Sequence, residues 1–155
     1  MGYIISLYLY HMKLIITESQ KEKVLRDLIK NNGVEFASNI VGGIENLFVL
    51  LNINSPMDFL HLFDNLEQVQ SKEKGHLILF RYKPKHNLMI YDTKKETVYI
   101  NYDEIWSFFE SNFGLKDKEI QGLTKKWLGE VYNLRGITMR YQRNWLFSSW
   151  ARYII

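Results

Sequence analysis

The sequence predicts an α+β fold in which a three-stranded antiparallel β-meander, at about residues 76–102, packs with N-terminal and C-terminal helices. Three strand-like runs cover residues 76–82, 87–92 and 97–102, where the apolar side chains alternate. The loops between these runs are too short for a crossover, so neighbouring strands must be antiparallel. Helical apolar stripes precede and follow the meander, and this grouping is typical of α+β domains.

The first helix is expected directly after a short strand at residues 12–17. Thr17 and Gln20 match the capping box, in which two side chains satisfy free backbone N–H groups at a helix start. Gly33 should end the helix, because glycine readily accepts the left-handed conformation found there. The apolar stripe of this helix comprises Val24, Leu25, Leu28 and Ile29.

A second helix start is marked by Ser55, Pro56 and Asp58. They place a hydroxyl at the N-cap, a proline at the first helical position and a carboxylate at the positive helix end. We expect this helix to run to Leu66, before the polar residues 68–75. A short buried helix is expected after the glycine turn at residues 42–43. Two helices should follow the meander, at residues 103–113 and 117–134.

The length of 155 residues favours one domain, residues 1–155, that needs no metal or disulfide to stay folded. Residues 1–11 and 141–155 are candidates for appended interaction segments. We expect residues 12–17 to belong to the core and residues 1–11 to be an add-on, with Met12 as an alternative start. The longest stretches without a charged residue are too short to span a bilayer, so no membrane span is expected.

The alternation in the meander separates two sets of side chains. One set is aliphatic and comprises Leu77, Leu79, Leu88, Ile90, Val98 and Ile100. The other set comprises Ile78, Phe80, Tyr82, Met89, Tyr91, Thr97, Tyr99 and Asn101. A sheet face with several aromatic rings can stack nucleobases. The interpretation that we favour is that helices cover both faces and that these rings belong to the core.

The net charge of +3 is unevenly distributed. Residues 1–70 contain 5 Lys/Arg and 8 Asp/Glu, whereas residues 71–155 contain 15 and 9. A basic patch attracts phosphate backbones, although it can also be a solubilising surface. The candidate nucleic-acid-binding residues are Arg81, Lys83, Lys85, Lys125, Lys126, Arg135, Arg140 and Arg143.

Both ends of the chain are rich in aromatic residues. Such side chains are unlikely to be left in water, and they make good anchors because they bury a large area with little loss of rotamer entropy. They should therefore dock on the same domain, on a second subunit or on another protein. The candidate partner-binding residues are Tyr8, Tyr10, Trp145, Phe147, Trp150 and Tyr153.

Evidence for catalysis in the sequence is weak. Asp58, His61 and Asp64 recur at i, i+3 spacing, a set of residue types that can bind a metal or orient a general base. However, they drift around the predicted helix, and Asp58 is already explained by the helix start. Cysteine is absent, which excludes a disulfide scaffold, a thiolate nucleophile and a zinc ribbon. No phosphate-binding loop, nucleophile elbow or zinc-protease motif occurs. We therefore lean against an enzyme and expect neither a cofactor nor a metal.

The segment at residues 12–20, MKLIITESQ, resembles the opening of many small uncharacterised proteins of tailed phages and their bacterial hosts. The resemblance covers nine residues and carries no catalytic or binding residue. It implies a small phage-encoded accessory or virion-associated protein.

These observations predict a non-enzymatic interaction or assembly protein, a component of a larger complex or phage-type particle. The alternative is a nucleic-acid-binding accessory protein that uses the basic C-terminal half. A small hydrolase built on Asp58, His61 and Asp64 is a third reading. We expect a protein partner or self-association, and a location in the cytoplasm or, for a phage-encoded protein, in the virion.

Overall fold

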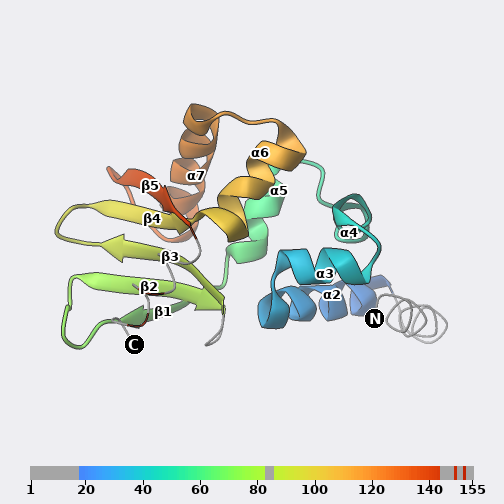
Figure 1. Cartoon of the computed structure of the whole chain (residues 1–155), viewed down its shortest axis with the longest axis horizontal. Coiled ribbons are helices and arrows are strands. Elements are labelled where there is room, and N and C mark those ends of the chain that lie inside the picture. Colours follow the sequence, from blue (N-terminus) through green and yellow to red (C-terminus); the bar gives the residue numbers. More distant parts are fainter. Residues whose placement is uncertain (1–17, 83–85, 144–148, 150–151, 153–155) are drawn as a thin grey trace.

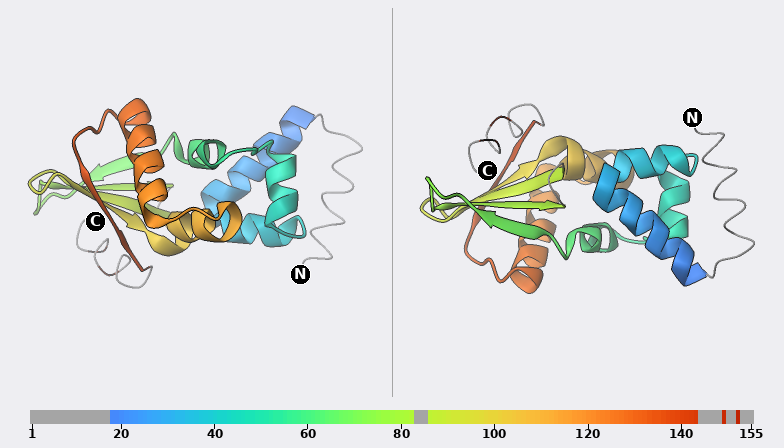
Figure 2. Two further views of the ribbon diagram at one scale, coloured as in Figure 1. Left: turned by 90° about the horizontal axis from the view of Figure 1, so that it is seen from above. Right: turned by 90° about the horizontal axis from the view of Figure 1, so that it is seen from below.

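A computed structural model describes residues 18–82, 86–143, 149 and 152 of the chain. A sheet occupies one end of the molecule and the helices α2, α3 and α4 occupy the other, with α5, α6 and α7 between or beside them (Figure 1). The two further views show that the molecule is elongated along this direction and that α7 lies on one face of the sheet (Figure 2). The α+β class is thus confirmed.

Four helices make up the N-terminal part of the described chain, and the sequence predicts three of them. They are α2 (Glu18–Asn32), α3 (Val34–Ile40), α4 (Ile44–Leu50) and α5 (Pro56–Leu60). Gly33 separates α2 from α3 with a φ of +91°, a conformation that glycine adopts without strain. The hydroxyl of Ser55 accepts the backbone N–H of Asp58, as the predicted cap requires. The predicted cap residue Thr17 lies outside the described residues.

The helix predicted to run to Leu66 is shorter than expected. α5 ends at Leu60, and a 3₁₀ turn, η1 (His61–Phe63), follows it. The chain then enters strand β1 (Glu67–Gln70), for which the polar sequence gave no signal. The short helix turn is a natural transition, because 3₁₀ turns commonly end α-helices.

The sheet contains the predicted meander and extends it on both sides. Its strands are β1, β2 (Leu77–Tyr82), β3 (His86–Asp92), β4 (Thr97–Asn101) and β5 (Thr138–Gln142), in that spatial order. Strands β1 to β4 are antiparallel, whereas β5 pairs with β4 in parallel. The predicted three-stranded meander therefore forms the centre of a five-stranded mixed sheet. β5 also includes the first two residues of the segment 141–155.

The connection from β4 to β5 contains the C-terminal helices. It begins with a π-helical turn, η2 (Tyr102–Trp106), which continues into α6 (Ser107–Phe113) and α7 (Asp117–Val131). Gly114 ends α6 in the left-handed conformation, so the helix ends at Phe113, as predicted. The long connection is what makes a parallel neighbour possible, since parallel strands need a crossover.

The predicted assignment of side chains to sheet faces is wrong for strand β4. Ile90 pairs with Tyr99, and Tyr91 pairs with Val98. Because residues directly opposite each other share a face, Val98 and Ile100 lie with the aromatic set. Tyr99 lies with Leu79 and Ile90 instead. The turn at residues 93–96 fixes this register, which differs by one residue from the predicted one.

The main core lies on the face that α7 covers. Phe80 and Tyr82 are buried there, so the predicted core role of these rings is confirmed and a stacking surface on them is excluded. Leu88, which was predicted to lie with Leu79, also joins this core. It is the extra residue of β3 where the register with β2 shifts after Phe80. A smaller cluster on the other face comprises Leu77, Leu79 and Ile90, with Val69 and Tyr99 packed against it.

Candidate functional site

Strand β5 is one of the two edge strands of the sheet. The side chain of Met139 is buried, whereas its neighbours Thr138 and Arg140 are exposed on the other side of the strand. All five residues of β5 pair with β4, from Thr138 opposite Thr97 to Gln142 opposite Asn101. No strand in the described part of the chain pairs with its other side.

The direction of the free backbone groups of β5 follows from one hydrogen bond. Thr138 donates its backbone N–H to the carbonyl of Glu96, at 2.8 Å. Backbone groups point alternately to either side of a strand, so Arg140 also faces β4. The N–H and C=O groups of Met139 and Tyr141 must therefore point toward the open edge. Such a row of groups can pair with a further extended chain.

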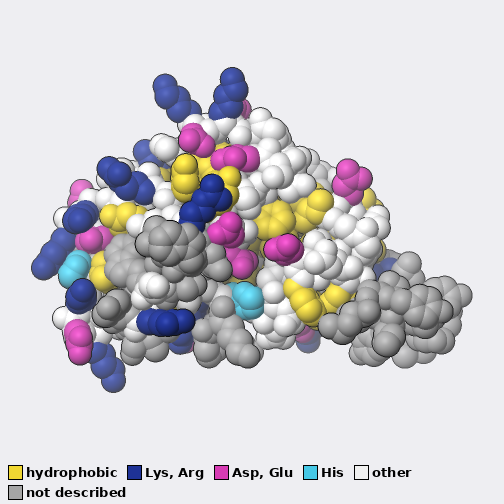
Figure 3. All heavy atoms as spheres, in the orientation of Figure 1, with side chains coloured by type: hydrophobic (Ala, Val, Ile, Leu, Met, Phe, Trp, Pro, Cys, Tyr) yellow, Lys and Arg dark blue, Asp and Glu magenta, His cyan; other side chains and the backbone are white. Residues whose placement is uncertain are grey.

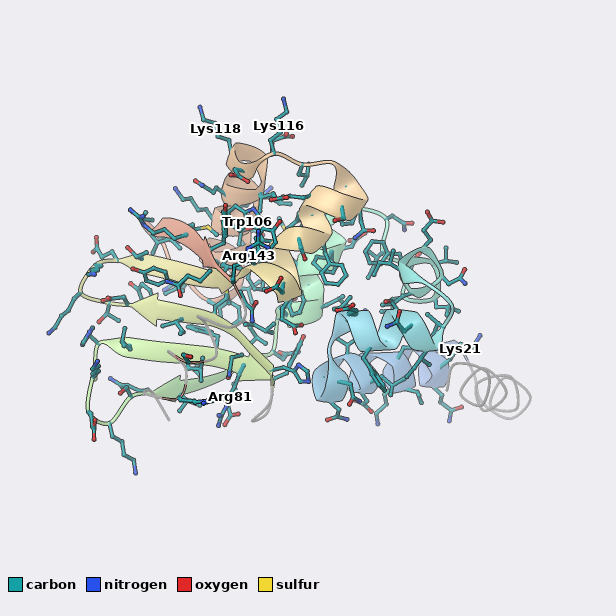
Figure 4. All side chains as sticks on the ribbon, viewed as in Figure 1. Lys21, Arg81, Trp106, Lys116, Lys118 and Arg143 are labelled. Carbon is teal, nitrogen blue, oxygen red and sulfur yellow. The ribbon has the colours of Figure 1, made fainter. Side chains whose placement is uncertain are left out.

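An aromatic cluster with a cation flanks the end of this edge. Tyr141 is 44% exposed and lies between two rings, with centroids 5.1 Å from Tyr102 and 5.0 Å from Trp106. The guanidinium carbon of Arg143 lies 4.0 Å from the centroid of the Tyr102 ring, a cation–π geometry. Figure 4 shows Trp106 and Arg143 close together where β5 passes the start of the crossover helices.

The cluster is held in place by hydrogen bonds to the helices. The Tyr102 hydroxyl donates to Oε2 of Glu110 at 3.2 Å, and Trp106 Nε1 donates to Oδ1 of Asp117 at 3.3 Å. Desolvation and the bond to Glu110 raise the pKa of Tyr102 above its ordinary value, so this hydroxyl stays protonated. Trp106 itself is completely buried and provides a rigid base for Tyr141.

A shallow hollow of about 740 Å³ runs along β5. Side chains from β4, the turn before it, α7 and β5 itself line the hollow. They are Lys95, Thr97, Tyr99, Gln121, Thr138, Met139, Arg140, Tyr141 and Gln142. The hollow thus combines two cations, two tyrosines and several uncharged hydrogen-bonding groups beside the open strand edge.

Basic side chains predominate around the sheet on the face that Figure 3 shows, where Lys and Arg gather over the sheet and α7. Several acidic side chains on the same face lie near the middle of the molecule, and others lie among the basic ones (Figure 3). The hollow beside β5 contains Lys95 and Arg140, and of the described residues that line it none is acidic. An anionic or hydrogen-bonding partner fits this surface better than an apolar one.

The structure brings together only some of the basic residues predicted to bind nucleic acid. Arg140 and Arg143 lie on or just after β5, and Lys125 and Lys126 are exposed on α7. The remaining described residues lie elsewhere. Arg81 is on β2 and forms an ion pair with Glu67, 3.1 Å away. Arg135 folds back over Gly129 at the end of α7. Lys83 and Lys85 lie outside the described residues.

The predicted partner-binding residues fall in the parts of the chain that the structure does not describe. They are Tyr8, Tyr10, Trp145, Phe147, Trp150 and Tyr153. Their role stays a prediction.

The three residues considered for a hydrolase do not form one set. Asp58 accepts the backbone N–H of Asn54 at 2.9 Å, and this bond contributes most to a lowered pKa of its carboxyl group. His61 and Asp64 do meet, with Nδ1 and Oδ2 2.9 Å apart, and Trp127 Nε1 donates to the other oxygen of Asp64 at 2.8 Å. Within the described ranges, no group of three metal-ligating side chains occurs.

Sequence reasoning missed several residues of the β5 surface. Lys95 and Gln121 come from a turn and a helix, and only the fold places them beside β5. Tyr102 was included in the third strand run but not considered as a partner of Arg143. The alternation of polar and apolar residues at 138–142 is the signal that could have revealed β5.

Among the described residues, no helix is long and apolar enough to cross a membrane. Comparison with protein-family models, with curated proteins and with solved structures found no match, so the geometry of the β5 edge carries the functional argument.

Proposed function

We propose that this chain is a non-enzymatic interaction protein that binds an extended segment of a partner along strand β5. The observation that carries the proposal is the open edge of β5, where the backbone groups of Met139 and Tyr141 point outward beside the hollow. A strand added here would gain main-chain hydrogen bonds, and the hollow would receive its alternate side chains. Lys95, Arg140 and Arg143 favour a segment of acidic character.

The edge of β5 differs from the other edge of the sheet in a way that supports this choice. β1 has only four residues, and Glu67, Gln68 and Gln70 are all exposed. Short, polar edge strands are a common protection against unwanted pairing. β5 has five residues, includes the buried Met139 and has an aromatic cluster at its end.

Two substitutions at Tyr141 test the role of the backbone. Tyr141→Ala removes the ring but keeps the outward N–H, whereas Tyr141→Pro removes both. Neither should break the pairing with β4, because this N–H does not face β4 and proline is tolerated at such edge positions. We expect the alanine variant to retain the partner captured from the native source and the proline variant to lose it.

Controls separate loss of binding from loss of folding. Thermal unfolding of both Tyr141 variants should show similar midpoints, while Arg140→Pro, which removes an N–H that faces β4, should unfold at a lower temperature. Equal capture by the alanine and proline variants would show that the edge is not used. Sedimentation of the pure chain tests whether the partner is a second copy, since Tyr141→Pro would then abolish the dimer.

A second candidate function is the binding of single-stranded nucleic acid at the same surface. The observation that favours it is the mixture of cations and rings: Lys95, Arg140 and Arg143 can bind phosphates, while Tyr141 is exposed enough to stack on a base. Arg81 is excluded from this surface by its position on β2 and its pairing with Glu67.

Anisotropy of a fluorescent oligonucleotide at several salt concentrations tests this second candidate. Affinity should fall with a log–log slope of about 0.7 per phosphate contact. The double variant Arg140→Gln/Arg143→Gln should reduce both the affinity and the slope. Lys118→Gln is the matched control, because Lys118 projects from the start of α7 away from the sheet (Figure 4). A flat salt dependence, or an equal loss in the control, would exclude this function.

The resemblance of residues 12–20 to phage proteins supports a search for the partner among the components of a phage-type particle. Fractionation of the native source, with detection of the chain in the particle or in the cytoplasmic fraction, tests this part of the proposal.

A further inference from the structure

A second, smaller cavity lies between α2, η1 and the end of β2. Its volume is about 70 Å³. Five of its lining side chains carry N–H or O–H donors, and two more, Ile29 and Leu62, are aliphatic. No carboxylate is among the described residues that line the cavity. The five donors are Arg26, Lys30, His61, Asn65 and Tyr82.

Tyr82 is the first lining residue whose donor is available to a ligand in the cavity. The residue is only 5% exposed, yet its hydroxyl has no hydrogen-bond partner in the described part of the chain. Because the oxygen is not fully enclosed and the residue lines the cavity, the hydroxyl is available from the cavity.

Arg26 and His61 each have a nitrogen atom that takes no part in the hydrogen bonds of the described fold. Arg26 binds Oε1 of Glu22 through Nε and Nη2, at 3.1 and 2.8 Å, so its Nη1 is left over. His61 binds Asp64 through Nδ1, so its Nε2 is left over.

The other two donors are likewise uncommitted within the described residues. Neither Lys30 nor Asn65 has a hydrogen bond or ion pair there. Lys30 lies one helical turn after Arg26 on α2, which places both cations on the same side of the cavity. Arg26 and Lys30 therefore place two positive charges beside a cavity that no carboxylate of the described residues lines, and the nearby carboxylates of Glu22 and Asp64 pair with Arg26 and His61.

We propose that this cavity binds a phosphate group, with Arg26 and Lys30 supplying charge and His61 and Tyr82 supplying hydrogen bonds. A carboxylate offers two acceptor oxygens in one plane, whereas a phosphate group offers at least three in a tetrahedral arrangement, so a phosphate can reach donors on more sides of the cavity. A metal ion would be repelled by these donors. The small volume holds one phosphate group and leaves any organic part attached to it outside.

The proposed phosphate site shares no residue with the β5 surface, so the two proposals can fail independently. Burial and the nearby Asp64 raise the pKa of Tyr82, while the charge of Arg26 opposes them. The hydroxyl thus stays a donor at neutral pH and lies within the influence of Arg26. A protonated Tyr82 hydroxyl near the charge of Arg26 suits an anion that bridges these two side chains.

Titration of the full chain with inorganic phosphate, followed by ¹H–¹⁵N NMR at constant ionic strength, tests the proposal. Saturable shifts should appear at α2, η1 and the end of β2. Tyr82→Phe removes only the hydroxyl, and Lys30→Gln removes only a charge from a partly exposed residue. We expect each variant to lower the affinity about tenfold, as for loss of one charge-assisted or buried hydrogen bond. Lys94→Gln, which removes the same charge in the β3–β4 turn, should bind as the unaltered chain does.

A parallel titration with glycerol phosphate distinguishes the two sources of the phosphate group. Tighter binding of the ester supports a phosphate carried by an organic molecule, and tighter binding of inorganic phosphate supports the free anion. The proposal is overturned by shifts that do not saturate, by variants at Tyr82 and Lys30 that bind as well as the unaltered chain, or by an equal loss in Lys94→Gln.

Discussion

The indole Nε1 of Trp127 donates a hydrogen bond to the carboxylate of Asp64, 2.8 Å away and 63 residues earlier in the chain. A second tie lies beside it. The hydroxyl of Tyr132 donates to the carbonyl of Phe63 and accepts the backbone N–H of Leu66 at 3.1 Å. Helix α7 and the residue after it thereby fix the irregular segment between η1 and β1.

Removal of the Asp64 carboxylate should destabilise the fold because it leaves the completely buried Trp127 without an acceptor. We expect Asp64→Ala to lower the free energy of unfolding by about 1–3 kcal/mol, the usual cost of an unsatisfied buried donor. Asp64→Asn keeps an acceptor for the indole and should lose less. Urea denaturation measures both, and equal losses in the two variants would show that the indole bond is not the cause.

The sequence predicts the elements of this fold that depend on neighbouring residues, and it misses those that depend on residues far apart in the chain. The start of α5 at Ser55 and the end of α6 at Gly114 follow from caps, which act within one turn. The meander follows from alternation and short loops. β1 was missed because three of its four residues are exposed, and β5 because its parallel pairing depends on a connection of more than thirty residues.

The candidate sites also show that sequence spacing predicts contacts within one element but not contacts between elements. The i, i+3 spacing identified His61 and Asp64 as neighbours, and they do meet. It could not show that Asp58 turns back to Asn54, or that Tyr82 approaches from a strand. A register difference of one residue in β4 was enough to place Tyr99 on the wrong face, because side chains alternate strictly along a strand.

Two glycines provide opposite predictions for the same substitution. Gly122 lies within α7 with open space where a Cβ would be, so Gly122→Ala should raise the free energy of unfolding by about 0.5–1 kcal/mol. Gly33 has a φ of +91°, and its Cβ would lie 3.4 Å from Glu104 and 3.5 Å from His86. Gly33→Ala should therefore lower the stability by about 1 kcal/mol or more. Thermal or urea unfolding that moved both variants in one direction would contradict this explanation.

Phe59 should be the most sensitive position in the aromatic part of the core. It is completely buried on α5 and contacts rings from α4, η1 and α6. These rings, with centroids 5.4–6.3 Å away, are Phe48, Phe63, Phe108, Phe109 and Phe113. Phe59→Ala should cost about 3–5 kcal/mol, because it combines lost burial with a cavity. Phe59→Leu should retain a substantial part of that stability, and a loss below about 1 kcal/mol for the alanine variant would show that the ring cluster is not cohesive.

The last prediction concerns Glu104, which lies where η2 approaches the junction of α2 and α3. Its carboxylate is near Gly33 and the ring of His86, and His86 Nε2 donates to the carbonyl of Asn31 at 3.0 Å. Desolvation raises the pKa of Glu104 above its ordinary value of 4.5, and the charges of Glu35 and Asp103 act in the same direction. The charge of His86 opposes them. The net effect is that ionisation of Glu104 disfavours the folded state.

The sign of the pH dependence follows from proton uptake. Between neutral pH and 4.5, the folded chain binds a proton at Glu104 before the unfolded chain does, so the contribution of this group to stability rises as the pH falls. Glu104→Gln removes the penalty at neutral pH and should raise the unfolding midpoint there. The advantage of this variant over the unaltered chain should shrink as the pH is lowered from 7 toward 5. Glu73→Gln, at an exposed position between β1 and β2, should keep a constant difference across the same range. An advantage of Glu104→Gln that grew on acidification would show that its attraction to His86 outweighs the cost of burying Glu104.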